Sequence, residues 1–314
     1  MTEDMTVLTL GVHVLDVLAR PVETIPDGQG AALLEQIKAS AAGTAGGTAL
    51  SLAKLGATVR SAGAIGTDAL GDLLLSLLQR GGVDTTLLVR RADVQTSASV
   101  LPIRPDGSRP ALHVIGANGS YGLDDVPWDA LDTVTHLHFG APEFLGGEAA
   151  AKVASYARER GVVCSADLLA PGDPGILAWI EPLLPLLDYL LPNDEQLLGL
   201  TATADLAEGA RRLVDAGVGC VVVTRGAQGA LAVDAEGVTA IPAFEVPIID
   251  TSGCGDAFSA GFLRGIALGR TIQAAAVLGC ATAALVAGGL GSDHGDFDLA
   301  AVDAFAANTG VLDA

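Results

Sequence analysis

Basic and aromatic residues are scarce in this sequence. Its 314 residues include 17 Lys and Arg against 37 Asp and Glu, a formal net charge of −20 at pH 7, and aromatic residues make up 4%. An acidic chain of this kind repels the phosphates of nucleic acids and anionic membrane surfaces. We therefore expect small molecules as partners, with no nucleic acid and no membrane. Half of the residues are apolar, enough for a sizeable core in one large α/β domain or two smaller ones.

Cysteine is also scarce, and its pattern indicates a compartment. The four cysteines lie far apart in the sequence and form no CxxC pair: Cys164, Cys220, Cys254 and Cys280. This usage is typical of reduced thiols in a cytosolic protein. The first eleven residues, MTEDMTVLTLG, are acidic and contain no long apolar run, so no secretory signal is expected. A cytoplasmic location is the prediction.

Two common phosphate-binding motifs are missing. None of the lysines Lys38, Lys54 and Lys152 ends a GxxxxGK[ST] motif. No well-placed GxGxxG with a downstream acid follows the first apolar run. These absences argue against a P-loop protein and against a nicotinamide-binding Rossmann protein.

One long segment carries no formal charge. Between Arg270 and Asp293 lie 22 such residues, long enough to be considered as a membrane span. The segment is rich in Ala, Gly and Thr, contains Gln273 and has no second segment like it. A helix buried against a sheet has the same pattern and is the preferred interpretation.

Apolar runs of strand length alternate with stretches of helical period. Strands are predicted at 6–12, 58–66, 135–140, 161–167, 187–192 and 220–226, most of them ending in Gly, Asp or Pro. Leucines between 70 and 78 form one apolar stripe of a helix that ends at Gly81, and residues 206–217 repeat the pattern. Repeated strand–helix units predict a mostly parallel sheet covered by helices on both faces. Ligands of such sheets bind beyond the carboxyl ends of the strands, where the strand order reverses.

Residues 93–118 interrupt this alternation. They predict strands of period 2 around a turn at Asp106–Gly107, with no helix directly after. Together with residues 12–40 they form, in our interpretation, a small β lid that encloses a substrate and excludes water. An ordinary surface hairpin is the alternative.

The segment IIDTSGCGDAFSAG, residues 248–261, carries the most specific chemistry. Gly253, Cys254 and Gly255 allow a sharp turn after an extended run, and a helical pattern follows. The first N–H groups of a helix lack partners and lie at the positive end of its dipole, so they bind anions. Asp256 in the first turn is either a helix-favouring acid or a general base that takes a proton from a substrate hydroxyl. In the second case the amides of 253–256 stabilise a transferring phosphoryl group.

This segment and several others resemble the ribokinase-like (PfkB) carbohydrate kinases. DTSGCGDAFSAGFL (250–263) looks like their carboxyl-terminal signature, D-T-x-G-[AC]-G-D. Residues 49–85 are similar to the amino-terminal region of the family, GAN (116–118) to the end of its lid and VVVTRGAQGAL (221–231) to the strand and turn near its nucleotide. The resemblance implies a ribokinase-like three-layer α/β fold. It also implies a single domain over 1–314, with lid segments at approximately 12–40 and 93–118.

The resemblance implies a role for each matching residue. Asp256 would be the base, with Gly253, Cys254 and Gly255 as the anion hole. The expected substrate-binding residues are Asp16, Gly43, Gly47 and Asn118, and the expected ATP-binding residues are Asn193, Thr224, Gly226 and Gly229. Asp250 and Ser252 would lie at the monovalent-cation site, such as one for K⁺, that many members have, and Gln196 stands where the family has the glutamate that acts on Mg²⁺.

The sequence departs from the family pattern near the substrate. Ala42–Gly43 replaces a Gly-Gly pair, Gly47 replaces an Asn, and Val14 replaces a polar contact. Fewer hydrogen bonds would then reach a free pentose, and a bulkier substrate gains room. No lysine follows the Ala-Gly pair, which weakens the case for a sugar phosphate unless Arg104 or Arg109 of the lid compensates. Asp167, at the end of a strand, either points into the cleft or caps a loop.

The activity that the resemblance implies is an ATP-dependent transfer of the γ-phosphoryl group to a hydroxyl of a sugar or sugar-like metabolite. A nucleoside (adenosine-like) kinase is the first alternative, because the altered substrate wall has room for a base. A ligand-binding homologue that has lost efficient phosphotransfer is the second, and Gln196 and Gly47 motivate it. A nucleotide-dependent enzyme of unrelated chemistry is the third. Relatives often pair through the lid, so a homodimer is a further expectation.

Overall fold

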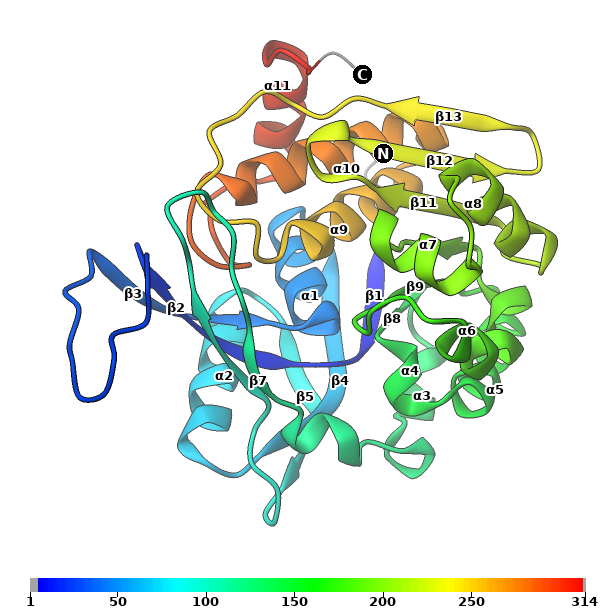
Figure 1. Ribbon diagram of the computed structural model, residues 1–314. Coiled ribbons are helices and arrows are strands. Elements are labelled where there is room, and N and C mark those ends of the chain that lie inside the picture. Colours follow the sequence, from blue (N-terminus) through cyan, green and yellow to red (C-terminus); the bar gives the residue numbers. More distant parts are fainter. Residues whose placement is uncertain (1–4, 313–314) are drawn as a thin grey trace.

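A nine-stranded sheet runs through the part of the chain, residues 5–312, that the computed structural model describes (Figure 1). Its strand order is β13-β12-β11-β10-β9-β8-β1-β4-β5. The strands from β11 to β5 pair in parallel, and β12 and β13 add an antiparallel edge. The bounds are β1 Thr6–Gly11, β4 Thr58–Gly66, β5 Asp84–Arg91, β8 His136–Gly140, β9 Val163–Asp167, β10 Tyr189–Leu190, β11 Cys220–Thr224, β12 Ala230–Asp234 and β13 Val238–Ile241.

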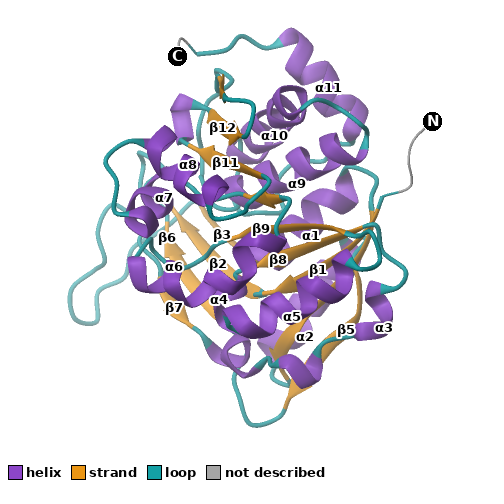
Figure 2. Ribbon diagram, turned by 90° about the vertical axis from the view of Figure 1, so that its right-hand side faces the viewer, coloured by secondary structure: helices purple, strands orange, loops and turns teal. Residues whose placement is uncertain are grey.

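Helices cover both faces of this sheet (Figure 2). On one face lie α1 (Thr44–Lys54), α2 (Ala69–Arg80), α9 (Cys254–Ala267), α10 (Ile272–Ala287) and α11 (Leu299–Asn308). On the other lie α3 (Trp128–Leu131), α4 (Pro142–Leu145), α5 (Gly147–Arg158), α6 (Pro174–Ile180), α7 (Asp194–Thr201) and α8 (Leu206–Asp215). Val7 of β1 packs into the first core, and Leu8 and Leu10 pack into the second. Alternate side chains of a strand thus build two cores, and the expected three-layer α/β fold is confirmed.

The predicted strands and helices recur with shifted ends. The expected strand at 187–192 is only the two-residue β10, and the helix expected to start near Asp256 starts two residues earlier, at Cys254. The uncharged segment 271–292 contains α10, which packs closely on α9. Within residues 5–312 we find no helix that combines the length and the hydropathy of a bilayer span. The four cysteines are free thiols.

A second sheet of four strands lies beside the first, within the described residues (Figure 1). Its order is β3-β2-β6-β7, with β2 at Val14–Arg20, β3 at Gln36–Ala42, β6 at Ala98–Pro102 and β7 at Leu112–Val114. These strands come from the two segments expected to form the lid, and we call them the lid sheet. The β2 strand follows β1 after two residues, so the lid sheet begins at the carboxyl end of a central strand.

The strand order reverses at β1, where β4 lies on one side and β8 on the other. Open α/β sheets bind ligands beyond the carboxyl ends of strands at such a point. The lid sheet and the turn before α9 both lie at this edge.

Candidate active site

The turn before α9 depends on a glycine that no other residue could replace without strain. Gly253 has φ 73°, in the left-handed region, and it precedes the first residue of α9. A Cβ atom at this position would also lie 2.3 Å from Oγ of Ser292. Glycine therefore permits both the backbone turn and the close approach of the segment that follows α10.

The amides of this turn differ in their hydrogen bonds. The N–H of Cys254 donates to the carbonyl of Thr251 at 3.3 Å, so this amide already has a protein acceptor. In the described chain, no bond from the N–H groups of Gly253 or Gly255 is seen outside the helix itself. Gly255 has open space where a side chain would be. The positive end of the α9 dipole and its first amides are thus presented to a ligand, with Cys254 contributing less than expected.

Two cavities meet at this turn. The first, of about 450 Å³, lies between the lid sheet and the main sheet, and Asp16, Gly43, Asp167 and Asp256 are among its lining residues. The second, of about 370 Å³, lies between the β12–β13 edge and the helices α9 and α10. Gly255, Thr224 and Thr251 line both cavities. A ligand in each cavity would therefore come together at the amino end of α9.

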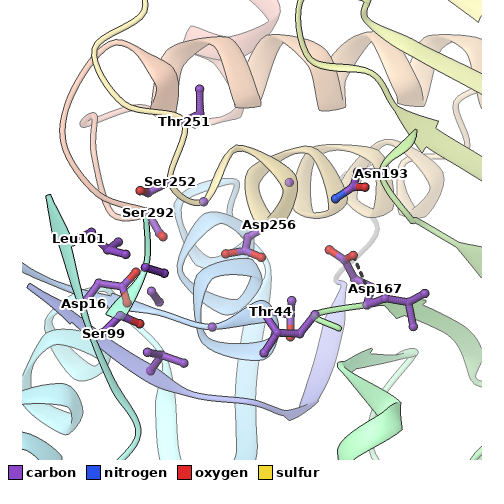
Figure 3. A pocket seen from close by; sticks show the side chains of 18 of the residues that line it. Asp16, Thr44, Ser99, Leu101, Asp167, Asn193, Thr251, Ser252, Asp256 and Ser292 are labelled. Carbon is purple, nitrogen blue, oxygen red and sulfur yellow. Dashed lines mark hydrogen bonds between the residues drawn. The ribbon is translucent and has the colours of Figure 1, made fainter. Parts of the chain in front are cut away.

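Asp256 lies in the first cavity between Asp16 and Asp167 (Figure 3). Burial raises the pKa of its carboxyl well above the ordinary value, the charges of Asp167 and Asp16 raise it further, and Arg109 lowers it. A carboxylate with a raised pKa is a stronger base. Asp256 is therefore suited to accept a proton from a group bound in this cavity.

Asp167 is the second carboxylate in the first cavity. Its side chain points into the cavity instead of only capping a loop. Its Oδ2 accepts a hydrogen bond from Ser259 Oγ at 3.1 Å, and its Oδ1 accepts one from the N–H of Leu168 at 2.8 Å. Burial raises the pKa of Asp167 to about 7, although both hydrogen bonds lower it. Since Ser259 lies three residues after Asp256 on α9, the same helix holds both carboxylates.

The lid sheet supplies the opposite wall. Asp16 on β2 lies beside Ser99 on β6, and Ser99 Oγ lies 3.0 Å from Nδ1 of His113 on β7. Burial raises the pKa of Asp16 to about 6, while the hydrogen bond from Ser99 and the charge of Arg109 lower it. Arg109 lines the cavity, and its Nε has no hydrogen-bond partner among the described residues. Arg104, the other lid arginine considered from the sequence, does not line the cavity.

The three remaining residues expected to bind substrate have different positions. Gly43 lines the first cavity, whereas Gly47 and Asn118 do not. Gly47 lies on α1 directly against Asp256, and an added Cβ would come within 2.1 Å of Oδ2. Asn118 is buried and holds the backbone of His13 through two hydrogen bonds of 3.1 and 2.9 Å. Asn118 therefore fixes the connection between β1 and β2.

Three of the four residues expected to bind ATP lie around the second cavity. Thr224, Gly226 and Gly229 line it, and the rest of its wall is mostly Ala, Val, Ile, Phe and Leu. Asn193 lines the first cavity instead and caps α7 by accepting from the N–H of Gln196 at 2.8 Å. An apolar cavity next to an anion-binding helix end fits a nucleotide, whose base is planar and whose phosphates are charged.

The residues expected to bind metals are all in hydrogen bonds with the protein. The buried carboxylate of Asp250 accepts from Ser252 N–H and Oγ at 2.9 and 2.7 Å and from Gly291 N–H at 2.9 Å. Oε1 of Gln196 accepts from Asn193 N–H, and Nε2 donates to the carbonyls of Leu168 and Ala170. Among the described residues no group of three or more His, Cys, Asp or Glu converges as a metal site.

Sequence reasoning missed several cavity residues. Thr44, at the start of α1, lines the first cavity, and its buried Oγ1 has no partner in the described chain. Ser99, His113 and Ser292 were also not expected. The signal for Thr44 was its place directly after Gly43, where a lysine would have favoured a sugar-phosphate substrate. Ser99 and His113 gave no comparable signal, because cross-strand pairing within the lid sheet brings them to the cavity.

Comparison with known proteins extends this description. The family model "pfkB family carbohydrate kinase" matches residues 8–296. An ATP-dependent ribose-1-phosphate kinase of Halopiger xanaduensis is 29% identical over 285 residues, which cover 90% of this chain and 92% of that protein. A nucleoside kinase of Methanothermobacter thermautotrophicus is 24% identical over 291 residues, 91% of this chain and 90% of that one.

Solved structures show the same fold. An E. coli protein described as a ribokinase II, in complex with ATP and Mg²⁺, superposes with a TM-score of 0.84 at 21% identity. The match covers 96% of this chain and 98% of the other. The fold therefore recurs in a solved structure, although the two sequences have diverged widely.

Proposed function

Because this chain belongs to the pfkB family of carbohydrate kinases and is an ATP-dependent kinase, we propose that Asp256 is its general base and that the acceptor is a hydroxyl of a sugar or sugar-like metabolite. The observation that carries the proposal is the position of Asp256. Its carboxylate faces the first cavity one residue after Gly255, which lines both cavities. An acceptor alcohol and a phosphoryl donor would meet at that point.

The residues of the chain act on one proton and one phosphoryl group. Asp256 takes the proton of the acceptor hydroxyl as the alcohol oxygen bonds to the γ-phosphorus, and the bond from that phosphorus to the β–γ bridging oxygen breaks to release ADP. The amides at the start of α9 stabilise the charge on the phosphoryl oxygens. Holding both reactants at one edge converts a bimolecular step into an effectively unimolecular one.

ATP would occupy the second cavity. Its base would lie against the apolar wall, with Thr224, Gly226 and Gly229 beside it, and its triphosphate would point to the amino end of α9. A Mg²⁺ ion would neutralise phosphate charge, and the chain residues nearest to that role are Gln196 and Asn193, which line the first cavity. Because the Gln196 oxygen already accepts a hydrogen bond, we assign it to a water on the ion rather than to the ion.

The first cavity favours a neutral acceptor with several hydroxyls. Asp16, Ser99 and His113 offer acceptors and donors on one side, and Thr44 offers a free hydroxyl on the other. Among the residues that the structure describes, Arg109 is the only Lys or Arg that lines this cavity, against the carboxylates of Asp16, Asp167 and Asp256. A phosphorylated sugar would bring two more negative charges to this group, and like charges close together are unfavourable.

A nucleoside acceptor is the second candidate. Val14, Leu101 and Leu169 form apolar parts of the wall around the first cavity. Such surface stabilises a base or another apolar substituent of the sugar better than it stabilises water. The assay must therefore include nucleosides beside free sugars.

The lid sheet also supports the proposal of a homodimer. Its inner face carries Asp16 and Ser99, whereas Val100, Leu112 and Ile37 lie on the other face and are 48, 64 and 68% exposed. Val100 pairs directly with Leu112, so these side chains form one apolar surface. We propose that the lid sheet of a second copy of the chain covers this surface, because an exposed apolar sheet face is unfavourable in water.

The test is a coupled assay of ADP formation with ATP and a panel of free sugars, ribose 1-phosphate and nucleosides. We expect turnover with at least one unphosphorylated acceptor. The Asp256→Asn variant should lose about 10²-fold or more in kcat, because an amide cannot take the proton. Its binding of ATP, measured by calorimetry, should change little. Full turnover in Asp256→Asn would contradict the assignment of the base.

A further inference from the structure

Lysine is rare in this chain, and two of its lysines contact the same segment. Of the 17 basic residues only three are lysines, Lys38, Lys54 and Lys152. Lys38 and Lys54 both place their ammonium groups on residues 290–295, which we call the clamp segment. Lys152 is exposed on α5. The clamp segment follows α10, and Ser292 within it lines the first cavity.

Lys54, the last residue of α1, has an acceptor for each N–H of its ammonium group. Its Nζ donates to the carbonyl oxygens of Asp293, His294 and Gly295 at 2.8, 3.0 and 2.6 Å. The ring of Phe297 lies 4.8 Å from the same nitrogen. An ammonium has three N–H donors, so three consecutive carbonyls satisfy all of them. The flat fork of an arginine would not fit three oxygens around one point.

Lys38 ties the clamp segment to the lid sheet. Its Nζ lies 2.7 Å from the carbonyl oxygen of Leu290 and 2.7 Å from Oδ1 of Asp293. Ser40 Oγ donates to the same Oδ1 at 2.7 Å. Both Lys38 and Ser40 belong to β3. The clamp segment thus joins the lid sheet, through β3, to the carboxyl end of α1.

The clamp segment also touches the anion-binding turn. Ser292 packs so closely on Gly253 that a Cβ atom there would lie 2.4 Å from the Cβ of Ser292. Gly291 N–H donates to Asp250, which also accepts from Ser252. A shift of the clamp segment would therefore move residues 250–253 and, with them, the first amides of α9.

We propose that the Lys54 ammonium is a built-in monovalent cation, which holds the clamp segment by its carbonyls and so positions the anion-binding turn. Rings of backbone carbonyls are the ligands that replace the water around K⁺ in proteins, and here a side chain of the chain itself fills such a ring. The family resemblance led us to expect a monovalent cation at Asp250 and Ser252. The Asp250 carboxylate accepts three protein hydrogen bonds instead, and Arg109 Nε lies 3.8 Å from its Oδ1. The Lys54 ammonium lies in a separate ring of carbonyls in the clamp segment.

The first test measures stability and does not depend on the proposed function. Thermal unfolding is followed in tetramethylammonium chloride, in KCl and in propylammonium chloride at equal ionic strength. Wild type should have the same Tm in all three. Lys54→Ala should unfold roughly 3–6 °C lower in tetramethylammonium. Propylammonium replaces the atoms that the substitution removes. Both propylammonium and K⁺ should restore part of the lost Tm, because each enters the carbonyl ring.

Two variants serve as controls. Lys152→Ala removes the same charge from an exposed position and should have the wild-type Tm in every salt. Lys54→Arg keeps the charge but not the three-donor geometry, so neither K⁺ nor propylammonium should restore the Tm of this variant. A Lys54→Ala protein with the wild-type Tm, or one that no small cation restores, would overturn the proposal.

The second test rests on the proposed function, because it needs turnover. Amide hydrogen exchange of Lys54→Ala should be faster than wild type in residues 290–295 and 251–256 and equal elsewhere. Its kcat should fall by about 10²-fold, with KM for the acceptor within a few-fold, because the turn is displaced and not the substrate wall. If wild type shows no turnover, the proposed function fails while the exchange result still stands. Unchanged exchange in both segments would overturn the positioning role of Lys54.

Discussion

Gly47 lies on α1 against the carboxylate of Asp256, and an added Cβ would be 2.1 Å from Oδ2 and 2.8 Å from Cγ. We predict that Gly47→Ala displaces this carboxylate and lowers kcat by about 10²-fold. Alanine favours helices more than glycine does, so the loss would not come from a weaker α1. Steady-state kinetics with the best acceptor measures the effect.

The neighbouring position provides a matched control for this prediction. A Cβ at Gly46 would meet Cδ2 of His13 at 3.3 Å, and Asp256 is not among its contacts. Gly46→Ala should therefore keep kcat within a few-fold. Equal kinetics for Gly47→Ala and wild type would show that Asp256 has another productive position.

The charge of Asp167 acts on the titration of Asp256, which gives a prediction of pH dependence. The charge of Asp167 raises the pKa of Asp256. Asp167→Asn removes that charge, so Asp256 should lose its proton at a lower pH and the acid limb of the kcat/KM profile should move to lower pH. Glu236→Gln, an exposed acid in the turn between β12 and β13, should leave the limb in place. An acid limb that stays fixed in Asp167→Asn would exclude this coupling.

The same variant has a consequence for stability. Burial raises the pKa of Asp167 from 3.8 to about 7, so this carboxyl is protonated more readily in the folded chain than in the unfolded chain. Its contribution to stability is complete below the unfolded pKa and is lost as the pH rises through about 7. Asp167→Asn should therefore raise Tm relative to wild type at pH 8 and have a smaller effect at pH 5. Thermal unfolding at both pH values measures this difference.

At the scale of elements, the sequence predicted the helices and strands whose hydrophobic pattern is local. The leucine stripe at 70–78 predicts α2, because its periodicity is set by one buried face. The strand at 187–192 was too long in the prediction because its apolar residues continue beyond β10, and Leu191 is buried in the core without pairing as a strand. Apolar residues indicate burial, but hydrogen bonding to β9 and β11 determines where the strand begins and ends.

The residues of the candidate site also divide into those that a local sequence pattern predicts and those that only the folded chain brings together. The glycine turn and Asp256 are consecutive in the sequence, and a motif exposed them. Thr44, Ser99 and His113 reach the cavity from separate elements, and only the register of the lid sheet brings them together. The role of Lys54 could not be predicted either, because its three acceptors lie 239 to 241 residues away along the chain.

The α10 helix forms one wall of the second cavity, which allows the two cavities to be tested separately. Ala284 lines that cavity. We predict that Ala284→Leu raises KM for ATP about tenfold, equivalent to about 1.4 kcal/mol, because the larger side chain occupies space for the base. KM for the acceptor should change little. Ala274→Leu, an exposed position on the same helix, should leave both constants unchanged.

At the scale of the whole molecule, the lid sheet has two faces with different requirements. Its inner face lines the first cavity and carries Asp16 and Ser99. Its outer face is apolar, and although Leu15 and Ala41 on this face pack into the main core, Ile37, Val100 and Leu112 are exposed in one copy of the chain. A face of this composition is stabilised when another apolar surface covers it, and the lid sheet lies beside the main sheet (Figure 1).

We therefore predict that the chain is a dimer in solution and that charge on the outer face of the lid sheet separates it. Val100→Asp and Leu112→Asp each place a carboxylate among apolar side chains at paired positions of β6 and β7. Light scattering should give twice 31.5 kDa for wild type and 31.5 kDa for the variants. Leu73→Asp on α2, another exposed leucine, should stay dimeric. A monomeric wild type would contradict the prediction, as would Val100→Asp and Leu112→Asp proteins that remain dimers, because the apolar outer face would then have no second copy to cover it.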